Sequence, residues 1–401
     1  MMLAVWVPLL LPFLAVPLAR RLAEALPPRA AAWTLAGSAA VLAGGTLCSL
    51  GLLAAAGLLR LPPVAALGHL SLPWLTTAAP AAPFAAVLAA VALLVLVVRA
   101  ARTARRRQRE LRTARAALPS GDLRSEPLDL RSEPLDGRHP DPAGAHRPGH
   151  APSPDRNPDM RPQRASVRRA RPSAWPTAAL RAAALFRPTT PRRAGTLRRP
   201  ADHPLTVLDD ERADAFALPG RPGRPGRPGE PGRIVVTSGM LRALTGPERA
   251  ALLAHERAHL TARHHLFLAL AEHAAGIHPA LRGLRAPLGY HLERWADEVA
   301  AARVGDRAVT ARAVGRAALA ANRSPWPARP RLVAAAHSGP VPRRVAALLR
   351  PRPATAPGTW LRAAAVALAA CLALSTGASL EATADLHHTV EAAQQGTGAQ
   401  R

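Results

Sequence analysis

The chain has 401 residues, a formal net charge of +27 and 49% hydrophobic residues, but only 3% of its residues are aromatic. All of its basic residues are arginine, and alanine and proline abound, as expected from the coding bias of a GC-rich bacterial genome. The charge alone therefore does not indicate nucleic-acid binding. The two cysteines, Cys48 and Cys371, exclude a disulfide framework and a cysteine-based zinc site. Long apolar runs exclude a wholly soluble protein.

Four apolar stretches approach the length that a helix needs to cross a bilayer. They cover Met1–Leu18, Ala30–Leu59, Ala81–Val98 and Ala363–Leu380. Residues 1–98 are thus predicted to hold three transmembrane helices and residues 359–380 a fourth, with an amphipathic or buried helix as the alternative for the last. The first stretch is not expected to be a signal peptide, because its arginines follow the apolar run.

The placement of arginine orients these stretches, because cytoplasmic flanks carry the excess of basic residues. Arg20, Arg21 and Arg29 follow the first stretch, and a dense cluster from Arg99 to Arg115 follows the third. Both regions are therefore expected in the cytoplasm. We predict a multi-pass protein of the plasma membrane with the lipid bilayer as a partner, a cytoplasmic central region and a short extracellular tail over 381–401.

Residues 99–200 are rich in arginine and proline and show almost no apolar periodicity. The heptapeptide LRSEPLD occurs twice in tandem, at 123–129 and 130–136, which is typical of a tolerant disordered segment. We predict a disordered cytoplasmic linker. Its arginines lack interleaved aromatic side chains, so no direct binding of nucleic acid is expected.

A folded domain is predicted over residues 201–350. Short apolar runs at 205–208 and 233–237 indicate strands, and 214–218 indicates a strand or a loop edge. The run GRPGRPGRPGEPG at 220–232 is expected to form an extended turn, because proline and glycine break helices and central strands.

A helix with a catalytic motif follows these strands. Thr245 to Glu248 has the pattern of an N-cap with a capping box, and the helix then contains His255, Glu256 and His259 as H-E-x-x-H. Histidines four residues apart share one helix face, where both imidazoles can bind one zinc ion. Glu256 lies beside them, placed to take a proton from a metal-activated water.

A third protein ligand is required, and the first candidate is His265. It has the offset from the first histidine that the metzincin pattern uses. However, Ala262 and Arg263 are expected to continue the helix, which would put His265 and likewise His264 on another face. His273 and His278 are expected to be exposed or satisfied core histidines.

Glu293 is the second candidate, and we expect it to be the ligand. It lies four residues before Asp297, so both carboxylates share one face of a second helix. A glutamate ligand with a nearby carboxylate that hydrogen-bonds a ligand histidine provides the two layers that a zinc site needs. The alternative for this pair is a solvated acidic face.

The run LTGPERAALLAHERAHL, the later ERWADEVAAARVGD and the trailing PRRVAALL resemble the BlaR/MecR-type membrane metallopeptidases, metallopeptidase family 56, which is related to the HtpX and CAAX-prenyl protease group. The resemblance spans about Leu205 to Leu349 and the arrangement of the apolar stretches. It implies a mainly α protein with multi-span membrane helices and a cytoplasmic α+β zincin-like domain. It also implies that His255, His259 and Glu293 bind zinc, that Glu256 is the catalytic base and that Asp297 supports the ligands.

The resulting hypothesis is a membrane-bound zinc endopeptidase of the gluzincin type, with a protein or peptide as substrate. The resemblance favours regulated proteolysis of a cytoplasmic transcriptional repressor or other regulator. The alternatives are quality-control cleavage of membrane proteins and a non-catalytic zinc-binding signalling scaffold. Only residues 381–401 follow the fourth stretch, so antibiotic sensing is not implied. Tyr290, His291 and Arg294 are weak candidates for stabilising the oxyanion.

Overall fold

A computed structural model describes residues 2–68, 82–116, 203–323 except 222, 224 and 226–228, and then 340–351 and 359–398. These residues fall in one compact unit, made of 1–131 and 203–401. The tandem LRSEPLD repeat and the rest of the expected linker from residue 117 to 202 lie outside the described residues.

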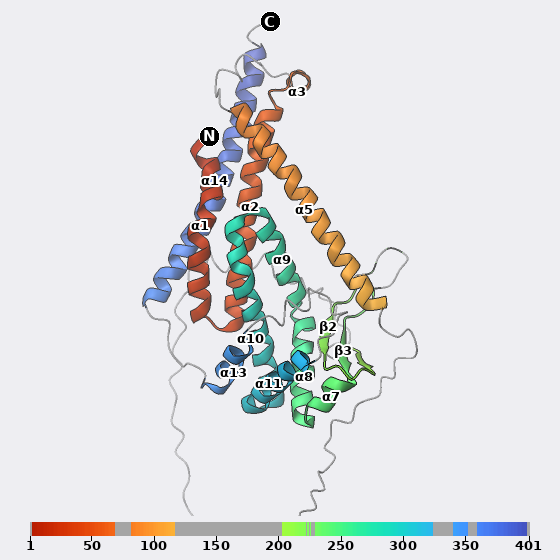
Figure 1. Ribbon diagram of the computed structural model, residues 1–401. Helices are drawn as coiled ribbons and strands as arrows, with labels where there is room; N and C mark the ends of the chain where they lie inside the picture. The colour runs from red at the N-terminus through yellow and green to blue at the C-terminus, as the bar shows by residue number, and fades with distance from the viewer. Residues whose placement is uncertain are drawn as a thin grey trace, which may run out of the picture. The chain divides into compact units, whose positions relative to one another are not determined.

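Four long helices carry the apolar stretches (Figure 1). They are α1 (Met2–Ala25), α2 (Pro28–Leu58), α5 (Ala82–Ala116) and α14 (Thr359–Gly398), and a short α3 (Pro62–Leu67) follows α2. Each long helix contains a segment of sufficient length and hydropathy to cross a membrane. The described part of the chain is therefore mostly helical, in agreement with the fold class expected, and consistent with a membrane protein.

Helix α5 corrects the expected start of the linker. We expected disorder from Arg99, but the helix continues through the arginine cluster to Ala116. Leu111 packs against the apolar cluster on the sheet, and the Arg107 guanidinium donates to the carbonyl oxygen of His265 at 2.7 Å. Arg115 donates to a further loop carbonyl at 2.8 Å. The arginine, alanine and leucine of this segment favour a helix, and the tertiary contacts stabilise it further.

A small sheet precedes the motif helix. It has the order β1-β3-β2, with β1 (Leu205–Leu208) parallel and β2 (Ala215–Leu218) antiparallel to the central β3 (Arg233–Thr237). All three predicted strand regions are therefore strands. The β-branched residues at the centre of β3 are fully buried, as expected for a central strand. A bridge between Arg221 and Glu230 closes the glycine-proline loop between β2 and β3.

The remaining helices surround the motif. They are α7 (Ser238–Ala243), α8 (Gly246–Thr261), α9 (His264–Ile277), the 3₁₀ helix η1 (Pro279–Leu284), α10 (Arg285–Val304), α11 (Arg307–Arg323) and α13 (Val341–Leu349). The predicted capping box is present at the start of α8, where the backbone N–H of Thr245 donates to the Glu248 carboxylate at 3.0 Å. It fixes the helix that carries H-E-x-x-H at its N-terminus.

The expected continuation of this helix through Ala262 and Arg263 is wrong. Helix α8 ends at Thr261, and Arg263 adopts the left-handed conformation with φ 53° and ψ 43°. A non-glycine residue in this region costs roughly 1–2 kcal/mol. Burial of His264 and Phe267 at the start of α9 offsets that cost. No glycine or proline marks the break, so the sequence pattern did not predict it.

Candidate metal centre

Helices α8 and α10 bring two histidines and a glutamate together. The group consists of His255, His259 and Glu293, all buried, with one ligand atom of each within 4.8 Å of the others. The two Nε2 atoms of the histidines are 3.0 Å apart. The Glu293 carboxylate oxygens lie 3.4 Å from Nε2 of His255 and 3.3 Å from Nε2 of His259.

These separations fit a tetrahedral metal ion. Zinc bonds of about 2.0–2.1 Å to nitrogen and oxygen place the ligand atoms of a tetrahedron roughly 3.3 Å apart. The measured separations of 3.0 to 3.4 Å are close to that value. Two imidazoles and one carboxylate are also the protein ligands of a known class of catalytic zinc site. The residues present therefore fit a zinc ion.

Asp297 and Arg344 contact two of the candidate ligands, His255 and Glu293. Asp297 Oδ1 lies 3.1 Å from His255 Nδ1, which directs the Nε2 lone pair of that ring towards the glutamate. The Arg344 guanidinium binds both oxygens of Asp297, from Nε at 2.9 Å and Nη2 at 2.6 Å. Its Nη1 lies 2.8 Å from Glu293 Oε2. One arginine thus fixes the orientation of two carboxylates.

The charges of this network reinforce one another. Burial opposes the charge on His255, but Asp297 and Glu293 outweigh it and raise the pKa of His255 to about 10. Burial would raise the pKa of Asp297, yet the hydrogen bonds from Arg344 and His255 hold that pKa well below its usual range. The two carboxylates likewise raise the pKa of Arg344 against the effect of burial. The same negative charge that retains a proton on His255 favours a metal cation, so protons and metal compete for the site.

His264 contacts the other histidine of the candidate ligand group, His259. Because the chain breaks at Arg263, Nδ1 of His264 lies 2.8 Å from Nδ1 of His259. Burial lowers the pKa of His264 to about 4, so its ring is neutral at neutral pH. If His259 faces the metal with Nε2, its Nδ1 carries the proton and donates to Nδ1 of His264. The ring of His264 also packs against Trp295, at 4.8 Å between ring centroids.

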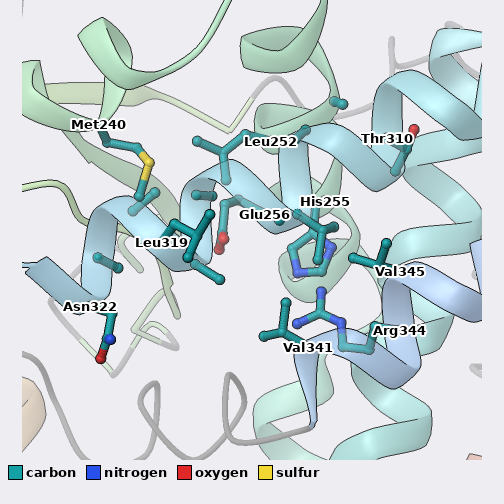
Figure 2. Close-up of a pocket in the computed structure, with 18 of the residues that line it drawn as sticks. Met240, Leu252, His255, Glu256, Thr310, Leu319, Asn322, Val341, Arg344 and Val345 are labelled. Atoms are coloured by element: carbon teal, nitrogen blue, oxygen red, sulfur yellow. The ribbon is translucent and has the colours of Figure 1, made fainter.

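A cavity of about 700 Å³ lies beside the cluster. Glu256 and His255 from α8 line it together with Arg344 from α13. Figure 2 shows Glu256 next to Leu252 and Leu319, with the His255 ring and the Arg344 guanidinium close to each other. Most of the remaining lining is alanine, valine and leucine from α8, α11 and α13. The cavity thus joins an apolar wall to the residues of the motif.

The other histidines and the weak oxyanion candidates lie elsewhere. His265 is not in the cluster, and its carbonyl accepts from Arg107 of α5. None of Tyr290, His291 and Arg294 lines the cavity. Tyr290 lies beneath the Arg343 guanidinium, at 4.6 Å, and Arg294 pairs with Glu298 of the same helix, at 2.9 Å. Burial lowers the pKa of His291 to about 4.

Two residues of the site were not predicted as such, Arg344 and His264. Arg344 belongs to PRRVAALL, where it shares a helix face with Leu348 four residues later, and both are buried. An arginine on the apolar face of a short helix indicates a buried ion-pair partner, and this signal was available in the sequence. His264 carried no such signal, because its position depends on the left-handed Arg263.

Residues 190–282 match the family model of Peptidase family M48. The matched segment includes the sheet and the H-E-x-x-H helix, and it ends before Glu293. No match was found among curated proteins or among solved structures. The match covers about a quarter of the 401 residues and supports a peptidase, specifically a metallopeptidase of this family. The BlaR/MecR-type assignment stays a prediction.

Proposed function

We propose that the protein is a membrane-bound zinc endopeptidase with Glu256 as its general base. The observation that carries this proposal is the position of Glu256, next to the ligand cluster and on the wall of the cavity. The match of residues 190–282 to a peptidase family supports it. A site that only stabilised the fold would need neither a cavity nor a carboxylate there.

His255, His259 and Glu293 would hold the zinc ion, which supplies Lewis-acid chemistry at a peptide carbonyl and makes water a stronger acid. Asp297 and His264 keep the two histidine rings in the tautomer and orientation for binding. The Glu256 carboxylate accepts the proton of the attacking water and then delivers it to the leaving amine. Arg344 holds Glu293 and Asp297 in place during these steps.

The cavity indicates how a substrate would lie. Its apolar lining from α11 and α13 suits an aliphatic side chain next to the cleaved bond, and the presence of Glu256 in the same lining supports a position of that bond near this carboxylate. We therefore propose a protein or peptide substrate with an aliphatic residue at this position. A cytoplasmic repressor remains our proposal for the biological substrate, and quality control of membrane proteins remains the second candidate.

The test compares Glu256→Gln with the wild-type full chain in lipid nanodiscs. Zinc content is measured per chain, and cleavage is measured on a mixture of quenched fluorescent peptides. We expect both proteins to bind one zinc ion and the variant to lose activity by about 10²–10⁴-fold, the usual contribution of a general base. The control is Glu230→Gln, a half-exposed glutamate on the loop after β2, which should change neither quantity.

Three results would contradict the proposal in different ways. Wild-type protein without zinc would remove the metal centre. Glu256→Gln with unchanged activity would show that another group is the base. Zinc in the wild type, with no cleavage of any peptide, would instead favour the signalling scaffold.

A further inference from the structure

Helices α9 and α10, joined by η1, form a hairpin that lies along the membrane-spanning helices α1 and α2 (Figure 1). Near its open end, Trp33 of α2 packs edge-on against Phe267, at 4.8 Å. At its closed end, His278 Nε2 donates to the carbonyl oxygen of Leu9 in α1, at 3.0 Å, and its ring lies 5.1 Å from that of Phe13. The closed end therefore reaches far along α1.

The register on α1 gives the depth of this closed end. Leu9 and Phe13 lie inside the candidate span Ala4–Ala25. The arginines at one end of the spans, Arg20 and Arg29, mark the level of the lipid headgroups. Leu9 is about 17 Å along the helix axis from Arg20, and the hydrocarbon core of a bilayer is about 30 Å thick. The closed end thus lies at a depth close to the middle of the membrane.

The hairpin is uncharged at its closed end and carries charged residues on either side of that end. The segment Ala274–Leu281 contains no charged residue, and Glu272, Arg282 and Arg285 flank it. We name these three residues the charged collar. Glu272 and Arg285 form an ion pair. A Cβ on the neighbouring Gly283 would lie 3.1 Å from Cγ1 of Val16 and 3.9 Å from Nη1 of Arg20, so the collar lies beside the turn of α1 that leads to this arginine.

The segment Ala274–Leu281 is the apolar tip of the hairpin, and both ring nitrogens of its histidine have hydrogen-bond partners. In His278, Nε2 donates to Leu9 while Nδ1 accepts from the backbone N–H of Ala280, at 3.2 Å. Leu281 and Leu284 are fully buried against the spans, whereas Pro279 is exposed. Leu266, further down α9, is 50% exposed. Backbone inside a bilayer is tolerated when helices or protein contacts satisfy it, as they do here.

We propose that Ala274–Leu281 enters the membrane as a re-entrant hairpin, in the leaflet at the arginine-bearing ends of α1 and α2. Lipid acyl chains are its partner on the side that the spans leave uncovered. Helix α9 alone is too short to cross, at about 21 Å against a core of about 30 Å. The charged collar lies among the headgroups, where Arg282 and Arg285 contact phosphate. The metal centre is then close to the membrane surface, because α9 rises only about 12 Å from His264 to Glu272.

The proposal concerns the membrane surface and does not depend on peptidase activity. It is tested with nitroxide labels on the full chain in lipid nanodiscs, in a background with Cys48→Ala and Cys371→Ala. Pro279→Cys labels the tip, and Ala302→Cys, an exposed position at the far end of α10, is the matched control. Leu94→Cys, 64% exposed on α5, is the reference for a lipid-facing site. Collision rates with oxygen and with a water-soluble nickel chelate are then measured.

We expect the label at position 279 to resemble that at position 94, with several-fold less contact with the nickel chelate and more contact with oxygen than the label at position 302. Equal nickel-chelate contact at 279 and 302 would overturn the proposal. If Pro279→Cys does not fold, Ala280→Cys tests the same level, and the same two outcomes decide.

Discussion

The two parts of α10 hold their neighbours by opposite means. In the part before Glu293, Leu288 and Leu292 are fully buried in an apolar cluster to which the alanine-rich α2 contributes. In the other part, which begins at Glu293, this residue and Asp297 are equally buried, but as carboxylates matched to histidine and to Arg344. Apolar packing tolerates changes that keep volume and shape. A buried charge tolerates no loss of its partner, because the remaining group keeps its full desolvation cost.

The strongest way to test this contrast is Arg344→Met, which keeps much of the side-chain volume and removes the charge. Two buried carboxylates then lose a shared cation, so we expect a loss of about 3–5 kcal/mol in the free energy of unfolding. We also expect a fall in activity, because Glu293 and Asp297 are no longer held in place. Thermal unfolding and peptide cleavage of the full chain in nanodiscs measure the two effects.

Arg343→Met is the matched control for this variant. Arg343 is the preceding residue, exposed, with its guanidinium over the ring of Tyr290. Its removal should cost no more than about 0.5–1 kcal/mol, the contribution of an exposed cation–π contact. Equal destabilisation by both variants would show that the ion pairs of Arg344 contribute no more to the free energy of unfolding than an exposed arginine does.

A smaller effect is expected from His264→Phe, which keeps a planar ring and removes the acceptor for His259. Partners that orient metal ligands typically contribute 10–100-fold to metal affinity, and we expect weaker zinc binding within that range. Titration with a competing chelator measures it. His265→Phe, next along the chain and outside the cluster, should leave zinc affinity unchanged. A change of similar size in both variants would contradict the assigned role.

The sequence predicted the parts of the site that local spacing determines. The four-residue interval in H-E-x-x-H and the interval from Glu293 to Asp297 each place two side chains on one helix face, and the structure brings both faces together. The pairing of Arg344 with Asp297 joins residues 47 positions apart and depends on how α13 packs on α10. The pattern around Arg344 indicates a buried partner for its charge, but it does not say which carboxylate that partner is.

Two features of the fold were missed for different reasons. The arginine cluster of α5 is rich in arginine, alanine and leucine, which favour a helix, and the contacts of Leu111 and Arg115 with the sheet and its loop stabilise it further. The break at Arg263 has no proline or glycine signal, and it depends on the tertiary packing of the residues that follow.

The smallest effect is expected from a change in the apolar packing between the long helices α1, α2 and α14. A Cβ on Gly45 of α2 would lie 2.5 Å from Oγ of Ser375 in α14 and 3.2 Å from Cβ of Pro8 in α1. The serine hydroxyl can rotate, so Gly45→Ala should cost only about 1 kcal/mol, less than typical overpacking. The adjacent Gly44 has nothing within 4 Å of the same position, so Gly44→Ala should be neutral or stabilising, because alanine favours a helix over glycine.

Zinc content separates this change from those at the metal centre. Both glycine variants should retain the wild-type zinc content and affinity, and only their melting temperatures in detergent should differ, with Gly45→Ala the lower. Close packing of α1, α2 and α14 then affects stability alone. If Gly45→Ala also weakened zinc binding, a change in the packing of the long helices would affect the candidate ligands. The coupling would run through α10, because Leu292 and Glu293 are adjacent on that helix. The two parts of α10 would then act as one unit.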